Sequence, residues 1–154
     1  MIRIPTLYQD LSDSMAKLRS SHEAVDKSRQ IVLNALQDGN AHYGINTGFG
    51  VLANKRISEE QLSELQQNIL LSHACGVGEP VPPEITRLML QLKIHALGIG
   101  KSGISRTTFR QLLAFEKKNL VAWVPSRGSV GASGDLARLA HLCLTLIGRG
   151  EVWD

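Results

Sequence analysis

The sequence is short of cysteine and of aromatic residues. Its 154 residues include only Cys75 and Cys143, which lie far apart and form no CxxC pattern. This spacing indicates neither a disulfide framework nor a cysteine-type zinc site, and it fits a reducing, cytoplasmic setting. Aromatic residues make up only 5% of the chain, which is too few for the stacking surfaces that hold single-stranded bases.

Runs of like charge and long hydrophobic runs are also missing. The formal net charge is +3 at pH 7, and no run of basic residues is long enough to follow a phosphate backbone. The N-terminus lacks the apolar core of a signal peptide, and no stretch of about 18 apolar residues could span a bilayer. We therefore expect neither nucleic acid nor a membrane as a partner.

Several familiar site patterns are absent or incomplete. None of the five histidines belongs to an H-E-x-x-H or similar pattern, so no metal is expected. Gly98–Gly103 has the letters G-x-G-x-x-G, but a helical pattern precedes it where a dinucleotide-binding fingerprint needs a strand. We interpret it as a helix end followed by a loop. Gly131–Asp135 is no nucleophile elbow either, because G-x-S-x-G needs glycine where Asp135 stands.

What is present is the composition and periodicity of one helical domain. The chain is 43% hydrophobic and 20% charged, which is typical of a globular domain of this length. Apolar residues recur at helical spacing in five regions. The sequence therefore predicts a mainly α fold in a single segment, 1–154, with any strand short and near 121–124; the predicted helices lie at about 7–37 (a pair of helices), 58–73, 83–97, 105–119 and 135–148.

Three glycine-containing loops, expected at 43–50, 72–78 and 128–135, interrupt these helices. The first packs three glycines around Tyr43, Asn46 and Phe49. Glycine permits backbone shapes that other residues resist, so such a loop can point Tyr43 and Asn46 at a fixed target. A plain Ω-type loop is the alternative interpretation.

Together, the stretches 43–50, 72–78 and 128–137 resemble the aromatic amino acid lyase family, in the family's order and at about its spacing. The resemblance covers nearly the whole chain from about Tyr43 onward. It implies the helical N-terminal segment of the ammonia-lyase fold, with glycine-rich active-site loops but without the C-terminal helical bundle. Family enzymes are several times longer and form homotetramers whose active sites combine residues from several subunits, so the resemblance implies a truncated chain.

The resemblance also implies a catalytic group made from Ala132, Ser133 and Gly134. In the family, the amide nitrogen at the Gly134 position attacks the carbonyl at the Ala132 position, two waters leave, and a 4-methylidene-imidazol-5-one (MIO) ring forms without an external cofactor. Serine supplies the hydroxyl that must be eliminated, and glycine leaves the attacking nitrogen unhindered in a strained bend. A helix that begins near Asp135 would favour negative charge developing on this electrophile.

The implied substrate is a small-molecule amino acid whose amine adds to the ring and departs as ammonia. Tyr43 matches the family's acid/base tyrosine, and Asn46 and Gly50 match positions that shape the pocket. His73 matches the position that reads the substrate side chain in the histidine-specific branch, which implies histidine catabolism with urocanate and ammonia as products. Without the resemblance, His73 would be interpreted as a histidine near a helix end, bonded to a loop carbonyl.

The sequence departs from the family at Arg138, where proline is usual. Proline is tolerated in the first turn of a helix, whereas arginine puts positive charge at the unfavourable end of the helix dipole, at a cost of up to about 1 kcal/mol. Two alternatives stay open: another aromatic amino acid ammonia-lyase or aminomutase, and a truncated, non-catalytic remnant. A remnant should leave apolar faces at Leu62–Ile69 and Leu136–Ile147 partly uncovered, which favours self-association.

Overall fold

The computed structural model describes residues 2–48, 54–129 and 134–153, and the mainly α prediction is confirmed. The helices of the described residues begin and end within two residues of the predicted ranges, except that α6 ends at Leu144, four residues before the predicted end, and a 3₁₀ turn continues from it to Ile147. Two short strands and two 3₁₀ turns complete the secondary structure of these described residues. The helices are α1 (Leu7–Ser20), α2 (Glu23–Gln37), α3 (Glu59–His73), α4 (Pro83–Gly98), α5 (Arg106–Lys117) and α6 (Leu136–Leu144), the 3₁₀ turns are η1 (Ile4–Thr6) and η4 (Thr145–Ile147), and the strands are β1 (Val77–Pro80) and β2 (Pro125–Arg127).

The prediction of a strand at 121–124 is wrong. The strand β2 lies just beyond it and pairs antiparallel with β1, with Val77 opposite Arg127. Within 121–124, Ala122 forms only an isolated bridge, to Val152. The apolar run there reflects burial, because Val124 is fully buried in the core. An apolar run of this length fits a buried connection as well as a strand, so periodicity alone could not separate the two.

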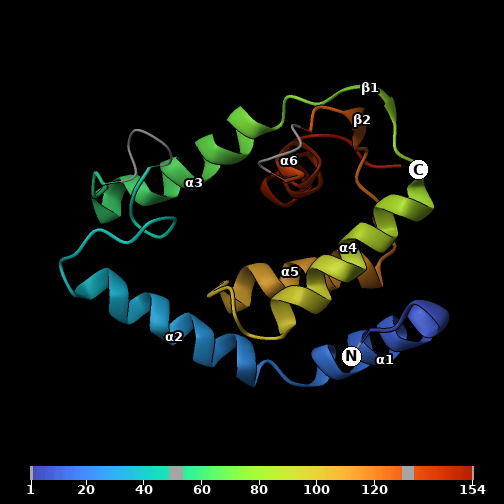
Figure 1. The fold of residues 1–154 in the computed structure, drawn as a ribbon, viewed down its shortest axis with the longest axis horizontal. Coiled ribbons are helices and arrows are strands. Elements are labelled where there is room, and N and C mark those ends of the chain that lie inside the picture. Colours follow the sequence, from blue (N-terminus) through green and yellow to red (C-terminus); the bar gives the residue numbers. More distant parts are fainter. Residues whose placement is uncertain (1, 49–53, 130–133, 154) are drawn as a thin grey trace.

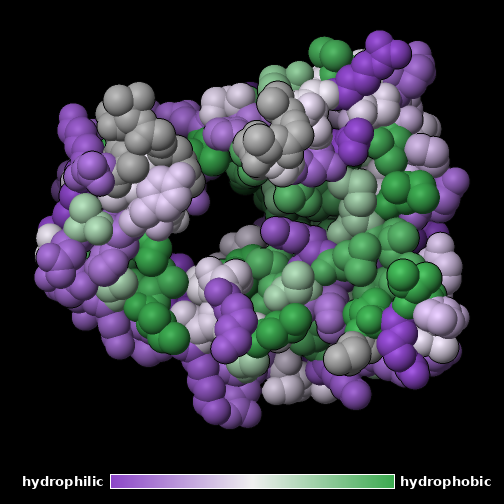
Figure 2. All heavy atoms as spheres, in the orientation of Figure 1, coloured by the Kyte–Doolittle hydropathy of each residue, from purple (hydrophilic) through white to green (hydrophobic). Residues whose placement is uncertain are grey.

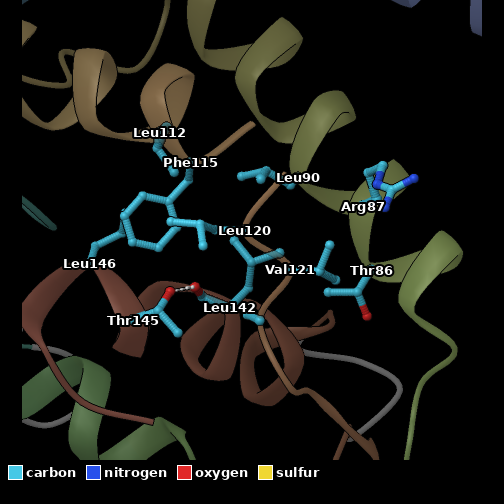
Figure 3. A pocket seen from close by; sticks show the side chains of 11 residues that line it. Thr86, Arg87, Leu90, Leu112, Phe115, Leu120, Val121, Leu142, Thr145 and Leu146 are labelled. Carbon is cyan, nitrogen blue, oxygen red and sulfur yellow. Dashed lines mark hydrogen bonds between the residues drawn. The ribbon is translucent and has the colours of Figure 1, made fainter. Parts of the chain in front are cut away.

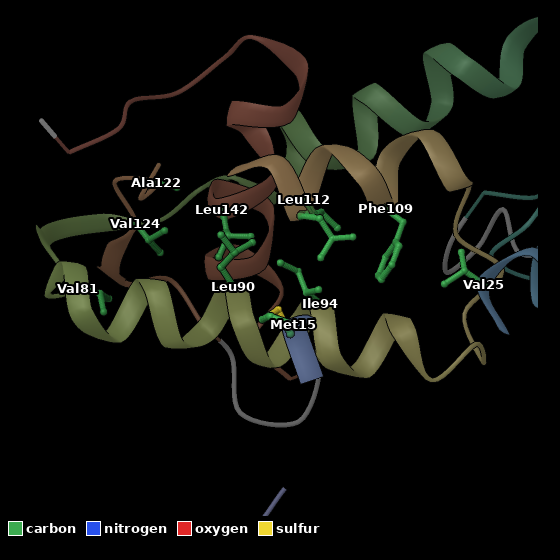
Figure 4. Packing of buried hydrophobic residues seen from close by; sticks show 11 residues of the cluster. Met15, Val25, Val81, Leu90, Ile94, Phe109, Leu112, Ala122, Val124 and Leu142 are labelled. Atoms are coloured by element: carbon green, nitrogen blue, oxygen red, sulfur yellow. The ribbon is translucent and has the colours of Figure 1, made fainter. Parts of the chain in front are cut away.

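One hydrophobic cluster holds α1, α2, α4, α5 and α6 together (Figure 4). Phe109 of α5 is fully buried in it and meets the ring of His22 edge to face, with ring centroids 5.7 Å apart. Ser105 starts α5 by accepting a hydrogen bond from the Thr108 amide through its side chain, at 3.1 Å. The main members of the cluster are Met15, Val25, Leu90, Ile94, Phe109, Leu112 and Leu142.

The connection between α4 and α5 packs closely on α2. A helix precedes Gly98–Gly103, which confirms that this segment is a helix end followed by a loop. Gly100 has a φ of +78°, and a Cβ there would lie 2.4 Å from the carbonyl oxygen of Ala24. The Gly103 amide donates to the Ser28 hydroxyl at 2.7 Å. These glycines therefore serve the packing of the α4–α5 connection on α2.

Helix α3 lies apart from the main cluster and packs against α6 (Figure 1). No described side chain of α3 is buried, and the apolar residues of its face, Leu62, Leu65, Ile69 and Leu70, are only half-buried. Figure 2 shows the molecule hollowed near its middle. None of the helices in the described ranges is long and apolar enough to cross a membrane.

Candidate functional site

The second and third glycine loops meet at the start of α6. Gly128 has a φ of +137°, and a Cβ on it would lie 2.8 Å from the Cα of Gly76 and 3.2 Å from the Cβ of Ala137. Only glycine fits such an approach of two backbones without a shift of one of them. The strands β1 and β2, which adjoin these two loops, also pair with each other. The loop after His73 and the loop before Ala132 are therefore neighbours, although more than fifty residues separate them.

His141 of α6 fixes the position of the His73 loop. Its Nε2 accepts a hydrogen bond from the Gly76 amide at 3.0 Å, so this nitrogen carries a lone pair and the ring is neutral in this arrangement. Burial lowers the pKa of His141, which favours the same neutral form. No specific role for this histidine could be predicted from the sequence, because its partner lies 65 residues away.

Gly134 stands directly before α6 in a left-handed conformation. Its φ is +78°, and no atom of the described residues lies within 4 Å of the place a Cβ would take. This left-handed bend, which glycine adopts readily, is compatible with the ring-forming role that the family resemblance implies for Gly134. Ala132 and Ser133 lie outside the described residues, so their roles stay predictions.

Arg138 forms hydrogen bonds with residues on both sides of the ring-forming segment. Its Nη2 donates to the carbonyl of Ser126 at 2.6 Å, and its Nη1 donates to Asp135 Oδ2 at 3.0 Å. The other carboxylate oxygen of Asp135 accepts a hydrogen bond from the hydroxyl of Ser129. The positive charge expected to be unfavourable at this helix start is thus offset by an adjacent carboxylate and a carbonyl.

The first glycine loop presents Tyr43 and buries Asn46. The Tyr43 side chain is 66% exposed. Asn46 is 1% exposed, its Oδ1 accepts from the His42 amide at 2.7 Å, and its Nδ2 donates to the Asn40 carbonyl at 2.9 Å. Asn46 therefore shapes this loop from within, and contact with a substrate stays a prediction. Gly50 lies outside the described residues.

His73 ends α3 with one ring nitrogen already engaged. Its Nδ1 lies 2.8 Å from the carbonyl oxygen of Ile69, one helical turn earlier, and can only donate to it. In the neutral ring Nε2 is then the acceptor. The histidine bonded near a helix end and the substrate-reading histidine are thus compatible, because they use different nitrogens.

Comparison with known proteins decides the family. A family profile described as aromatic amino acid lyase matches residues 8–154. The chain belongs to the aromatic amino acid lyase family. It is 52% identical over 134 residues to the histidine ammonia-lyase of Anaeromyxobacter dehalogenans (strain 2CP-C), covering 87% of this chain and 26% of that relative. The chain therefore spans about a quarter of the length of such relatives.

Solved structures agree with this assignment to the aromatic amino acid lyases. The histidine ammonia-lyase of Trypanosoma cruzi superposes with a TM-score of 0.76 at 36% identity, over 84% of this chain and 25% of that one. The ergothioneine-degrading ergothionase of Treponema denticola gives 0.81 at 30% identity, over 92% and 30%. The predicted N-terminal ammonia-lyase fold is confirmed.

The apolar pocket between α4, α5 and α6 is not a substrate site. It encloses only about 10 Å³, about the space of one water. Most of its walls belong to core residues such as Leu90, Leu112 and Leu142 (Figure 3). No group of three metal-ligating side chains occurs in the described part of the chain. The converging loops at α6 are therefore the candidate site of this member of the aromatic amino acid lyase family.

Burial of the His141 ring makes the stability of the fold depend on pH. In the unfolded chain His141 takes up a proton near its ordinary pKa of about 6.5, whereas the folded state disfavours that proton. Its contribution is therefore complete above about pH 6.5 and decreases as the pH falls further. His141→Gln keeps an acceptor for Gly76 but does not titrate. We expect its free energy of unfolding, measured in urea, to fall less than that of the wild type between about pH 7 and pH 5; equal pH dependences would contradict this role.

Proposed function

We propose that this chain carries out the non-oxidative deamination of L-histidine, with urocanate and ammonia as products. The observation that carries the proposal is the close approach of Gly128 to Gly76, since it sets the loop before Ala132 against the loop after His73. Membership of the aromatic amino acid lyase family and about 50% identity to histidine ammonia-lyases support the same reaction.

Ala132, Ser133 and Gly134 would form the MIO group without an external cofactor. A bond forms between the Gly134 nitrogen and the Ala132 carbonyl carbon, and the Ala132 oxygen leaves as water with the amide protons of Ser133 and Gly134. The Ser133 hydroxyl leaves with its Cα proton as the second water. The finished group would supply an electrophilic carbon to the substrate. The left-handed bend at Gly134 and its place before the α6 N-terminus support this assignment.

Tyr43 and His73 would handle the substrate. Tyr43 is proposed as the acid/base group, because a phenolic hydroxyl can both donate and accept a proton. His73 would accept a hydrogen bond at Nε2, which an imidazole N–H can donate and a phenyl ring cannot. Asn46 and Gly50 would complete the wall of the pocket on the side of the first loop.

The substrate preference is tested with His73→Phe. Ammonia release is measured from L-histidine, L-phenylalanine and L-tyrosine. We expect the wild type to prefer L-histidine, and the variant to lose that preference by about tenfold or more in kcat/KM, because a site built around a hydrogen bond rejects analogues that lack it. Leu71→Phe is the control, since Leu71 lies near His73 on α3 and is 46% exposed.

The outcomes separate the proposal from its alternatives. An unchanged preference in His73→Phe would contradict the role of His73. A wild type that prefers phenylalanine or tyrosine would favour another lyase or aminomutase. Absence of turnover with every substrate would favour the non-catalytic remnant. The likeness to ergothionase supports a second candidate, a lyase acting on an amino acid with a modified imidazole ring. Adding ergothioneine to the panel tests it, with release of trimethylamine measured in place of ammonia because the amine of ergothioneine carries three methyl groups.

A cytoplasmic homotetramer is part of the proposal. Both cysteines are free and Cys75 is exposed, which fits a reducing compartment. The half-buried apolar residues of α3 support association with further chains. Light scattering of the purified protein tests this point, and a stable monomer would contradict it.

A further inference from the structure

The C-terminal end of α3 depends on the loop that follows it, because the helix itself packs loosely. No described side chain of α3 is buried, and the apolar face that meets α6 is only half-buried. His73 is the last residue of the helix, and the Ala74 amide ends it by donating to the Leu70 carbonyl at 3.0 Å. The place of His73 relative to the third glycine loop is therefore set by contacts beyond the helix.

Gly76 is the point at which this loop is anchored. Its amide donates to Nε2 of His141 at 3.0 Å. A Cβ at Gly76 would lie 3.0 Å from the same nitrogen and 3.1 Å from the carbonyl oxygen of Arg127. The Gly76 backbone thus fits between the imidazole of α6 and the end of β2, and Gly128 approaches it from the third loop. Only two residues separate this anchor from His73.

We propose that His141 is a positioning residue for substrate choice, because its bond to Gly76 holds His73 at a fixed distance from the third glycine loop. The Nδ1 of His73 already donates to the Ile69 carbonyl at 2.8 Å, which fixes the ring on α3. A shift of the end of α3 would therefore carry Nε2 of His73 with it. The inference rests on the proposed function, since it concerns how the proposed substrate-reading residue is held.

A neutral histidine in the core-facing part of α6 is suited to this task. Its neighbours Ala140 and Leu142 are buried, and Leu142 belongs to the main hydrophobic cluster, so the backbone that carries His141 is well fixed. The imidazole is rigid, and in its neutral form Nε2 offers a lone pair to the Gly76 amide. His141 thus connects the packed core to the loosely packed end of α3.

The test measures substrate preference in two variants of His141. His141→Leu removes the acceptor, whereas His141→Gln places an amide oxygen within reach of the Gly76 amide. The preference is the ratio of kcat/KM for L-histidine to that for L-phenylalanine. We expect His141→Leu to lower this ratio by about threefold to tenfold, since small misplacements of a binding group have effects of this order. His141→Gln should restore it.

His95 provides a matched control. Its Nδ1 lies 2.7 Å from the hydroxyl of Ser14, so it also joins two helices, α4 and α1, through one hydrogen bond. His95→Leu removes that bond at a place away from the glycine loops. We expect this variant to keep the wild-type preference for L-histidine, even if its urea midpoint falls.

A double variant shows whether His141 acts through His73. In His73→Phe the hydrogen bond to the substrate is already lost, so adding His141→Leu should not lower the preference further. Such non-additivity is expected when one residue works only through another. A general loss of folded protein would instead lower the turnover of both substrates equally and leave their ratio unchanged.

Hydrogen exchange tests the anchor without any turnover. The Gly76 and Ala74 amides should exchange faster in His141→Leu than in the wild type, and His141→Gln should slow them again. The Phe109 amide, which bonds to the Ser105 carbonyl at 3.0 Å in α5, should exchange at the wild-type rate in both variants. Its unchanged rate would show that the core stays folded.

The results separate this inference from the proposed function. A wild type without turnover would overturn the proposed function, and with it the role of His141 in substrate choice. In an active wild type, an unchanged preference or unchanged Gly76 exchange in His141→Leu would overturn the positioning role alone, as would a further loss of preference in the double variant. A lowered preference that His141→Gln restores would support it.

Discussion

Ser133→Ala is expected to abolish ammonia release from L-histidine. Alanine has no hydroxyl to eliminate, so the second water cannot leave and the electrophilic carbon cannot form. Without that carbon the substrate's amine cannot be activated for departure. Ammonia release should therefore fall to the background of an assay without protein. The measurement is ammonia and urocanate formed by wild type and variant at equal concentration of folded protein.

A matched serine separates this effect from the loss of any hydroxyl. Ser20 lies at the exposed end of α1, where its hydroxyl donates to the Lys17 carbonyl at 2.8 Å. Ser20→Ala should keep the wild-type rate. Turnover retained in Ser133→Ala would show that the tripeptide takes no part in the mechanism. The chain would then not use the chemistry that its family resemblance implies.

Phe109→Ala is expected to produce the largest loss of stability among single core substitutions. The side chain is among the largest fully buried ones, belongs to the core cluster and packs edge to face on His22. Removing a buried phenylalanine ring costs about 3–5 kcal/mol, from lost burial and from the cavity that remains. This is a large fraction of the about 5–15 kcal/mol that stabilises an ordinary domain.

Urea unfolding of Phe109→Ala and Tyr8→Ala measures this effect against a control. Tyr8 is also aromatic but is 72% exposed on α1, so its removal should change the free energy of unfolding by no more than about 0.5 kcal/mol. A loss below about 1 kcal/mol for Phe109→Ala would contradict the packing of α5 described above.

Local patterns predicted the helices well. Helix α5 begins after Ser105 and α4 at Pro83, because capping and proline preferences act within one turn. The loops that carry Tyr43 and Gly134, and the loop that follows His73, were also expected from their glycines and from the family's motifs. The family assignment followed from the same three stretches and is confirmed by the match to residues 8–154.

Contacts between distant residues could not be predicted in this way. The bond from the Gly76 amide to His141 and the approach of Gly128 to Gly76 depend on the packing of α6 against α3 and on the pairing of β1 with β2. The same holds for Arg138, whose charge looks unfavourable when α6 is considered alone. Its partner, the Ser126 carbonyl in β2, can be identified only from the three-dimensional arrangement of the two ends of the third loop.

The intact mass of the purified chain tests the central claim most directly. The claim is that this segment folds well enough to turn Ala132, Ser133 and Gly134 into the MIO group. The account predicts a mass lower than that calculated from the sequence by two waters, with no such deficit in Ser133→Ala. An unmodified wild-type mass would contradict the account, and the non-catalytic remnant would then describe this chain better.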